Sequence, residues 1–170
     1  MKNLDDITDF TDFENGERNG WENEIGSPDG ILKTEAGPEG PNTFWSGKLE
    51  WRPPNTFLPS LFKMFTLSGK EQEKEWLEIS FKYRVYPPEP GEATTITGVI
   101  TQHFSIAYNN FFIDEHTPTN EWLQGDPIQI LVVYSNNLSH LLIGARNGIG
   151  PGVSRKIDID DIKVVRTPVK

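Results

Sequence analysis

The feature that most constrains the fold is a strict alternation of side-chain types between residues 75 and 85. Every second residue there is apolar, and those residues are Leu77, Ile79, Phe81, Tyr83 and Val85. The intervening positions carry mostly polar side chains. Because successive side chains of a β-strand point to opposite faces, this pattern predicts a strand with one face in a core and the other toward water or a ligand.

Shorter alternating or apolar runs recur along the chain, and no stretch keeps helical spacing for three turns. We therefore predict further strands over residues 7–13, 31–36, 43–51, 62–67, 98–106, 127–134, 140–145 and 157–165. Clusters of Gly, Pro and Asn separate these strands, and the segments 52–60, 86–97 and 107–120 are predicted to be long loops. The turn at 135–139 predicts a hairpin between the strands on either side. Together these signals indicate an all-β fold.

Length and charge restrict the organisation and the partners. The 170 residues contain no internal repeat, so we predict one domain across residues 1–170. The 25 acidic residues exceed the 16 basic ones and give a net charge of −9, which would repel a phosphate backbone and excludes nucleic acid as an expected partner. The chain contains no run of about 18 apolar residues, so we predict no membrane span. Without cysteine, the chain has no disulfides or thiolate metal sites.

Three short segments carry a likeness to a known family. Near the start the sequence reads Asp12-Phe13-Glu14-Asn15-Gly16 and then Gly20-Trp21, near the end it reads Ile157-Asp158-Ile159-Asp160-Asp161-Ile162, and between them lies Ser46-Gly47-Lys48-Leu49. This pattern resembles the calcium-containing jelly-roll carbohydrate-binding modules of bacterial polysaccharide-degrading enzymes. The resemblance implies a two-sheet antiparallel β-sandwich with jelly-roll topology.

The same resemblance implies a structural calcium ion (Ca2+). A jelly roll often places its first and last strands side by side, which would bring carboxylates from the two ends of the chain together. The implied ligands are the Glu14 side chain, a carboxylate of the Asp160-Asp161 pair, and backbone carbonyls near Asp12 and Lys48. The alternative is a solvated acidic strand end that holds no ion and discourages edge pairing.

The five tryptophans divide between core and binding surface. Trp76 lies on the polar side of the 75–85 strand, where a large ring is a candidate platform for stacking against a sugar. Its alternative role is that of a strand-start residue covered by a loop. Trp51 and Trp45 share one face of their strand and are candidates either for ligand contact or for the core. Trp21 and Trp122 are predicted to be core residues.

Further candidates for glycan contact come from loops and from polar strand positions. Tyrosines in or beside long loops would add aromatic surface, and polar side chains near the platform would read the sugar hydroxyls. The alternative for each polar candidate is an exposed position without a ligand. These candidates are Tyr86, Tyr108, Arg84, Glu78, His103 and Gln129.

The sequence therefore predicts a non-catalytic carbohydrate-binding module that recognises a glycan or polysaccharide on a concave sheet or loop rim. Its expected partners are a polysaccharide and an attached catalytic domain, and its expected location is extracellular or at a cell surface. Two alternatives stay open. One is a small jelly-roll lyase or hydrolase acting on polysaccharide, because acidic pairs are plentiful. The other is a structural or adhesion domain of a surface or phage assembly.

Overall fold

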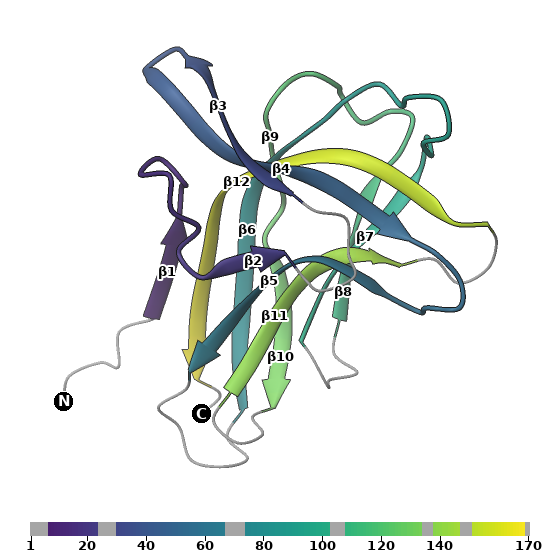
Figure 1. The fold of residues 1–170 in the computed structure, drawn as a ribbon. Coiled ribbons are helices and arrows are strands. Elements are labelled where there is room, and N and C mark those ends of the chain that lie inside the picture. Colours follow the sequence, from purple (N-terminus) through teal and green to yellow (C-terminus); the bar gives the residue numbers. More distant parts are fainter. Residues whose placement is uncertain are drawn as a thin grey trace.

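The computed structural model describes residues 7–23, 30–66, 74–102, 108–133, 138–146 and 151–168. Within these ranges the secondary structure consists of strands and contains no helix. The described part of the chain accordingly has no helix long and apolar enough to cross a membrane. The strands form two antiparallel sheets, called here the larger and the smaller sheet (Figure 1).

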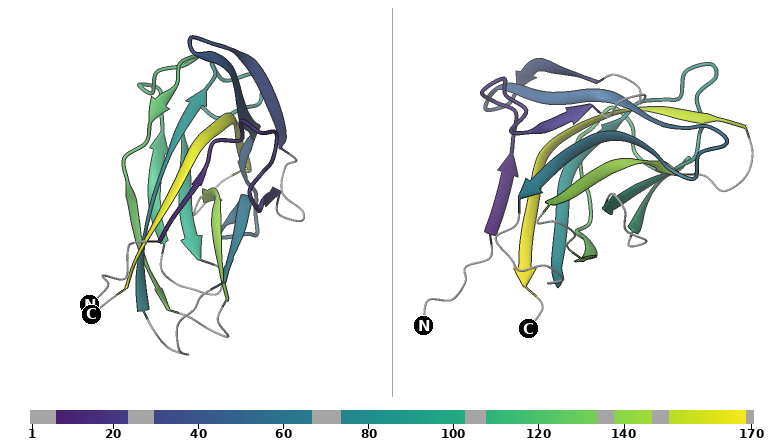
Figure 2. Two further views of the ribbon diagram at one scale, coloured as in Figure 1. Left: turned by 90° about the vertical axis from the view of Figure 1, so that its left-hand side faces the viewer. Right: turned by 60° about the horizontal axis from the view of Figure 1, so that its bottom comes forward.

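The larger sheet contains both ends of the described chain. Its central path runs β10-β6-β12-β4-β3, with β1 paired to β12 and β9 paired to β6. The strands are β1 (Ile7–Thr11), β3 (Ile31–Gly37), β4 (Gly40–Trp51), β6 (Lys74–Val85), β9 (Leu123–Gln124), β10 (Ile128–Val133) and β12 (Val153–Pro168). β12 is long and curved, and it runs between β4 and β6 along the sheet (Figures 1 and 2).

The smaller sheet has the order β2-β5-β11-β7-β8. Its strands are β2 (Trp21–Asn23), β5 (Leu58–Thr66), β11 (Leu138–Arg146), β7 (Ile96–Gln102) and β8 (Tyr108–Ile113). Consecutive parts of the chain repeatedly change sheet, as in β4 to β5 and β5 to β6. This arrangement confirms the predicted two-sheet antiparallel β-sandwich of the jelly-roll type.

The core lies between the two sheets and is built from the alternating apolar residues. In β6 the predicted inward residues Leu77, Ile79, Phe81 and Val85 are all buried. Each contributes about 1.5–3 kcal/mol of transfer free energy relative to exposure. The other face of β6 points away from the core, so period-2 spacing correctly divided this strand into two faces.

The expected strands are found with shifted ends, and three strands were missed. β2 and β9 are short, while β8 lies in the segment 107–120 that was predicted to be a loop. Some residues of the predicted strands and of the predicted turn lie outside the described residues. They are residue 67, residues 103–106, residue 134 and the turn residues 135–137.

The predicted hairpin between the strands before and after residues 135–139 is wrong. β10 pairs with β6 in the larger sheet, whereas β11 pairs with β5 and β7 in the smaller sheet. Two strands joined by a short connection usually pair, but in a sandwich such a connection can also pass from one sheet to the other.

Strands β1 and β12 lie side by side, as predicted for the two ends of the chain. The register pairs Ile7 with Arg166 and Thr11 with Ile162, and both views of the molecule show the two strands adjacent (Figures 1 and 2). A bulge in β12 between Asp160 and Lys163 interrupts its pairing with β6, and Asp161 there has a φ of 47°. The bulge places the acidic pair beside the segment that follows β1.

Candidate functional site

The outer face of the smaller sheet, which points away from the core, exposes large apolar side chains. Tyr108 and Phe112 on β8 are 51% and 63% exposed, and Met64 on β5 is 50% exposed. The strand register extends this face across the sheet, since Tyr108 stands opposite Thr101 and Phe62 stands opposite Leu142. We call the set Phe62, Met64, Tyr108 and Phe112 the aromatic face, although Met64 contributes a thioether rather than a ring.

Polar groups lie among these rings. The guanidinium carbon of Arg146 lies 4.3 Å from the ring centroid of Tyr108, and the His140 ring makes an edge contact with Phe62 at 6.2 Å. The side-chain oxygen of Asn110, which lies between Tyr108 and Phe112 on the same face, is buried and has no hydrogen-bond partner among the described residues. Exposed rings with an arginine and an amide among them are the composition of a ligand-binding surface.

The outer face of the larger sheet is organised around one cation. The Arg84 guanidinium donates to both the Asp158 carboxylate, with Nη2 to Oδ2 at 2.8 Å, and the Glu35 carboxylate, with Nη1 to Oε1 at 2.8 Å. Its carbon lies 4.9 Å from the Phe44 ring centroid and 4.6 Å from that of Trp122. Burial opposes the charge on Arg84, but the hydrogen bonds to Glu35 and Asp158 raise its pKa above the usual value.

Tyr86 closes this network. Its hydroxyl donates to Asp158 Oδ2, and the Lys156 amine lies 4.3 Å from its ring centroid. Burial raises the pKa of Tyr86 to about 12, and the Asp158 carboxylate adds to this shift. The candidates Arg84 and Tyr86 are therefore joined by direct contacts, and their polar groups are used within the protein.

Trp76, Glu78 and Gln129 share a second part of this outer face. Trp76 is 43% exposed and stands opposite Leu131, while the Gln129 amide donates to Glu78 Oε2 at 2.8 Å. Trp76 thus lies on the polar side of its strand, as the alternation predicted. Two further large apolar side chains of this sheet are exposed, Phe10 on β1 at 51% and Ile31 on β3 at 56%.

The structure corrects the expectation that Trp45 and Trp51 face a ligand. Both lie on one face of β4, but this is the core face, where they are 0% and 3% exposed. The Trp45 indole fills space that glycines leave, because a Cβ at Gly30 or Gly47 would lie 2.1 or 2.3 Å from its ring atoms. The Trp45 ring nitrogen donates to Asn23 Oδ1 at 3.0 Å. Neither indole can stack on a sugar without displacement from the core.

The other candidates fall in different places. Trp21 is fully buried, as predicted, whereas Trp122 is only partly buried and lies on the outer face of the larger sheet beside Arg84, not in the core. Tyr108 belongs to the aromatic face. His103 lies outside the described residues.

The predicted calcium ligands are only partly brought together. Asp160 is buried, and burial raises its pKa to about 6; the negative charges of Asp161 and Glu14 raise it further, while bonds from the Asp161 N–H and from Asn42 lower it. Glu14 Oε1 accepts from the Thr43 N–H at 3.0 Å, and Asp161 Oδ2 pairs with Lys82 at 2.6 Å.

The Lys48 carbonyl has another role, while the implied carbonyl near Asp12 stays a prediction. The Asp12 side chain accepts from the Glu14 N–H at 3.2 Å and so closes the turn after β1. Lys48 is paired with Lys156, four residues before Asp160 in β12 and thus roughly 13 Å along the strand. Its carbonyl accepts from Ser60 Oγ at 2.7 Å. The Lys48 carbonyl is therefore too far away to share a cation with Asp160, which corrects that expectation. Among the described residues, no group of three or more His, Cys, Asp or Glu is placed to hold a metal ion.

Solved structures with the same architecture are carbohydrate-binding domains and an enzyme segment. The CBM22-1 xylan-binding domain from Paenibacillus barcinonensis Xyn10C aligns with a TM-score of 0.57 and 13% identity, over 95% of this chain and 94% of that domain. The arabinose-bound MgGH51 α-L-arabinofuranosidase aligns with a TM-score of 0.50 and 12% identity, over 86% of this chain but 23% of the enzyme. At these identities the likeness concerns the fold alone.

A third neighbour, CBM27-1 from Caldicellulosiruptor saccharolyticus solved in complex with mannohexaose, gives a TM-score of 0.47 and 11% identity, over 92% of this chain and 96% of that one. No protein-family model matches the chain. No curated protein matches it either.

Sequence reasoning missed most of the aromatic face. Phe62, Met64, Phe112 and Arg146 were not among the predicted contact residues. A signal was present for β8, since Tyr108, Asn110 and Phe112 stand at alternate positions. Two adjacent asparagines, which strands disfavour, concealed it.

Proposed function

We propose that this protein is a non-catalytic carbohydrate-binding module that holds a glycan chain on the outer face of its smaller sheet. The observation that carries the proposal is the aromatic face itself, where Tyr108 and Phe112 on β8 expose half or more of their surface. The shared sandwich fold of a xylan-binding domain supports the same function. We propose a neutral polysaccharide as the ligand class, because the chain's net charge of −9 disfavours anionic polymers.

Binding would combine stacking and hydrogen bonding. Apolar C–H faces of sugar rings would pack on Tyr108 and Phe112, where desolvation of the aromatic surface supplies affinity. Arg146, Asn110 and His140 would contribute donors and acceptors for hydroxyl groups, which sets orientation and specificity. Because β-strands are rigid, the rings are already in position before the ligand arrives, and this reduces the entropy lost on binding.

Affinity electrophoresis in gels containing xylan, mannan or mixed-linkage β-glucan tests this proposal. We expect at least one polysaccharide to retard the wild-type protein and Tyr108→Ala to weaken that retardation about tenfold, since covering the exposed half of one aromatic ring contributes roughly 1–1.5 kcal/mol. Trp76→Ala is the matched control, because it removes an exposed ring from the other sheet, and we expect it to leave retardation unchanged. Loss of retardation in Trp76→Ala, with Tyr108→Ala unaffected, would transfer the site to the larger sheet.

The same incubations separate binding from catalysis. We expect no release of reducing sugar or of unsaturated product from any polysaccharide that retards the protein. Turnover that persists after repurification would make the chain a small polysaccharide-active enzyme and would overturn the proposal.

We further propose one structural calcium ion beside β12. A cation there would use the Glu14 and Asp160 carboxylates and would take its remaining oxygens from backbone carbonyls and water. The buried Asp160 carboxyl next to two other acids supports the proposal, because a bound cation would remove the repulsion between them. The ion pair of Asp161 with Lys82 makes Asp161 a weaker candidate.

Thermal unfolding in EDTA and in millimolar calcium tests this site. We expect calcium to raise the Tm in wild type and to have no effect in Glu14→Gln/Asp160→Asn, because a ligand that binds only the folded state stabilises it. An identical Tm in both buffers would mean that the acidic cluster holds no calcium.

We also propose that the chain acts attached to a catalytic domain and outside the cell. The enzyme neighbour supports the first part, since the matching segment is a fraction of its chain. Purification of the native protein from the extracellular fraction tests both parts. We expect the purified polypeptide to include a catalytic domain.

A further inference from the structure

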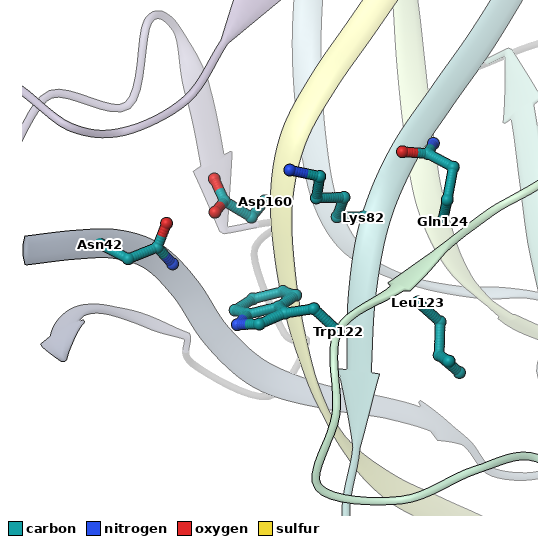
Figure 3. Close-up of a pocket in the computed structure, with 6 residues that line it drawn as sticks. All are labelled: Asn42, Lys82, Trp122, Leu123, Gln124 and Asp160. Carbon is teal, nitrogen blue, oxygen red and sulfur yellow. The ribbon is translucent and has the colours of Figure 1, made fainter. Parts of the chain in front are cut away.

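A small pocket lies on the outer face of the larger sheet, away from the proposed glycan face. It is lined by Asn42, Lys82, Trp122, Leu123, Gln124 and Asp160, and its volume is about 200 Å³. The polar ends of Asn42, Lys82 and Asp160 gather around the Trp122 indole (Figure 3). The lining comes from β4, β6, β12 and the segment around β9, which the sheet register brings together.

The Trp122 ring that lines this pocket is held in place from outside it. Its ring nitrogen donates to Glu35 Oε1 at 3.2 Å, and the Phe44 ring meets it edge to face at 5.3 Å. The Arg84 guanidinium carbon lies 4.6 Å from its centroid. Three contacts of different kinds fix one aromatic ring, so the pocket presents a preformed apolar surface.

The polar lining combines one positive side chain, one negative side chain and two neutral amides. Lys82 supplies an ammonium that also pairs with Asp161 at 2.6 Å, and Asp160 supplies a carboxylate that also accepts from the Asp161 N–H, while Asn42 and Gln124 add the amides. Among the residues that the structure describes, the Gln124 amide nitrogen makes two long contacts, 3.4 Å to the Phe81 carbonyl and 3.3 Å to the carbonyl of its neighbour Gly125. Such a lining suits hydroxyl groups, each of which donates and accepts, and it does not select for an anion or a cation.

We propose that this pocket is a second binding site, which takes one neutral sugar ring or a similar small polyol. The volume is below the range of about 300–1,000 Å³ that drug-sized ligands occupy, which limits the occupant to about one ring. The ring would lie against Trp122, with hydroxyls directed to Asn42, Lys82 and Asp160. The chemistry of the pocket carries this proposal, which does not depend on the aromatic face of the opposite sheet.

An NMR titration of the full chain with D-xylose, D-mannose and glycerol tests the proposal, with calcium present in every sample. We expect at least one of the two sugars to shift the Trp122 indole N–H and the Asn42 and Gln124 side-chain amide signals in a saturable way. Gln124→Ala should weaken the fitted affinity about threefold to tenfold, the value of one hydrogen bond. Gln129→Ala is the matched control, because it removes another exposed glutamine from the same sheet, and we expect an unchanged affinity.

Trp122→Phe provides a second variant that retains a ring against Arg84. We expect this variant to bind sugar more weakly and to unfold at the same midpoint as wild type. If its midpoint falls, the Gln124→Ala titration alone decides the test. The proposal is overturned if neither sugar shifts these signals, or if Gln124→Ala and Gln129→Ala behave alike. Polysaccharide retardation that is weakened by Tyr108→Ala, with an unchanged monosaccharide titration in the same variant, would show that this pocket and the proposed glycan face are separate sites. A negative result for one proposed site therefore does not decide the result for the other.

Discussion

The outer faces of the two sheets both place an arginine against aromatic rings, but the arginine is structural on one face and accessible on the other. On the larger sheet, Arg84 lies against the rings of Trp122 and Phe44 and is neutralised by Asp158 and Glu35. On the smaller sheet, Arg146 lies against Tyr108, whose ring stays half exposed. An arginine on an aromatic ring is therefore not in itself a sign of a binding site. Exposure of the ring distinguishes the two arginine sites, because Phe44 is buried and Trp122 is partly buried, whereas Tyr108 is half exposed.

The largest difference in stability between variants of the two faces should come from removing the buried guanidinium of Arg84. We expect Arg84→Met to lower the free energy of unfolding by about 3–5 kcal/mol, because Asp158 would remain buried without its partner. Urea unfolding at neutral pH measures this. Arg146→Met is the control on the other face, and we expect a change below about 1 kcal/mol. Equal losses in the two variants would remove the distinction between a structural and an accessible arginine.

A smaller change in stability, one that depends on pH, should follow from the buried Asp160 at the bulge. The raised pKa of Asp160, about 6, means that the folded state binds its proton more tightly than the unfolded state does. In EDTA, stability should therefore fall as the pH rises from about 4 to about 6 and then stay level. We expect Asp160→Asn to stabilise the fold by about 1–3 kcal/mol at pH 7.5 and to have almost no effect at pH 4.

Thermal unfolding of wild type and Asp160→Asn across this pH range checks the sign. With saturating calcium, wild type should be more stable than Asp160→Asn, since only wild type would retain both carboxylates for the proposed ion. A stabilisation by Asp160→Asn that is as large at pH 4 as at pH 7.5 would show that the carboxyl is not the cause.

The smallest effect concerns the polar pair near Trp76. We expect Gln129→Ala to change the free energy of unfolding by less than about 0.5 kcal/mol, because the Gln129–Glu78 hydrogen bond lies at an exposed position where water can replace it. Chemical denaturation measures this change. A loss above about 2 kcal/mol would mean that this part of the larger sheet is more constrained than its exposure indicates.

Much of the fold followed from local patterns. Period-2 spacing in β6 gave both the strand and its core face, and the acidic segment at the end of the chain was placed beside its beginning. The pairing of β10 and β11 could not be obtained this way, because no local signal tells whether a connection stays in one sheet or crosses to the other.

The candidate site was predicted less well, for a physical reason. Trp45 and Trp51 were correctly placed on one face of β4, but which face meets the other sheet depends on long-range packing, here on the space that Gly30 and Gly47 leave. The aromatic face joins β5 and β8, which do not neighbour each other in the sheet. Neither strand shows in isolation that its rings share a surface.

The proposed glycan-binding surface is the outer face of the smaller sheet. Its most direct test is an NMR titration of the wild-type chain with a soluble oligosaccharide of the polysaccharide that retards it most. We expect the shifted backbone signals to fall on β7, β8 and β11, with Tyr108, Asn110 and Arg146 among them. Shifts confined to Trp76, Glu78 and Gln129, or no saturable shift with any oligosaccharide, would contradict it.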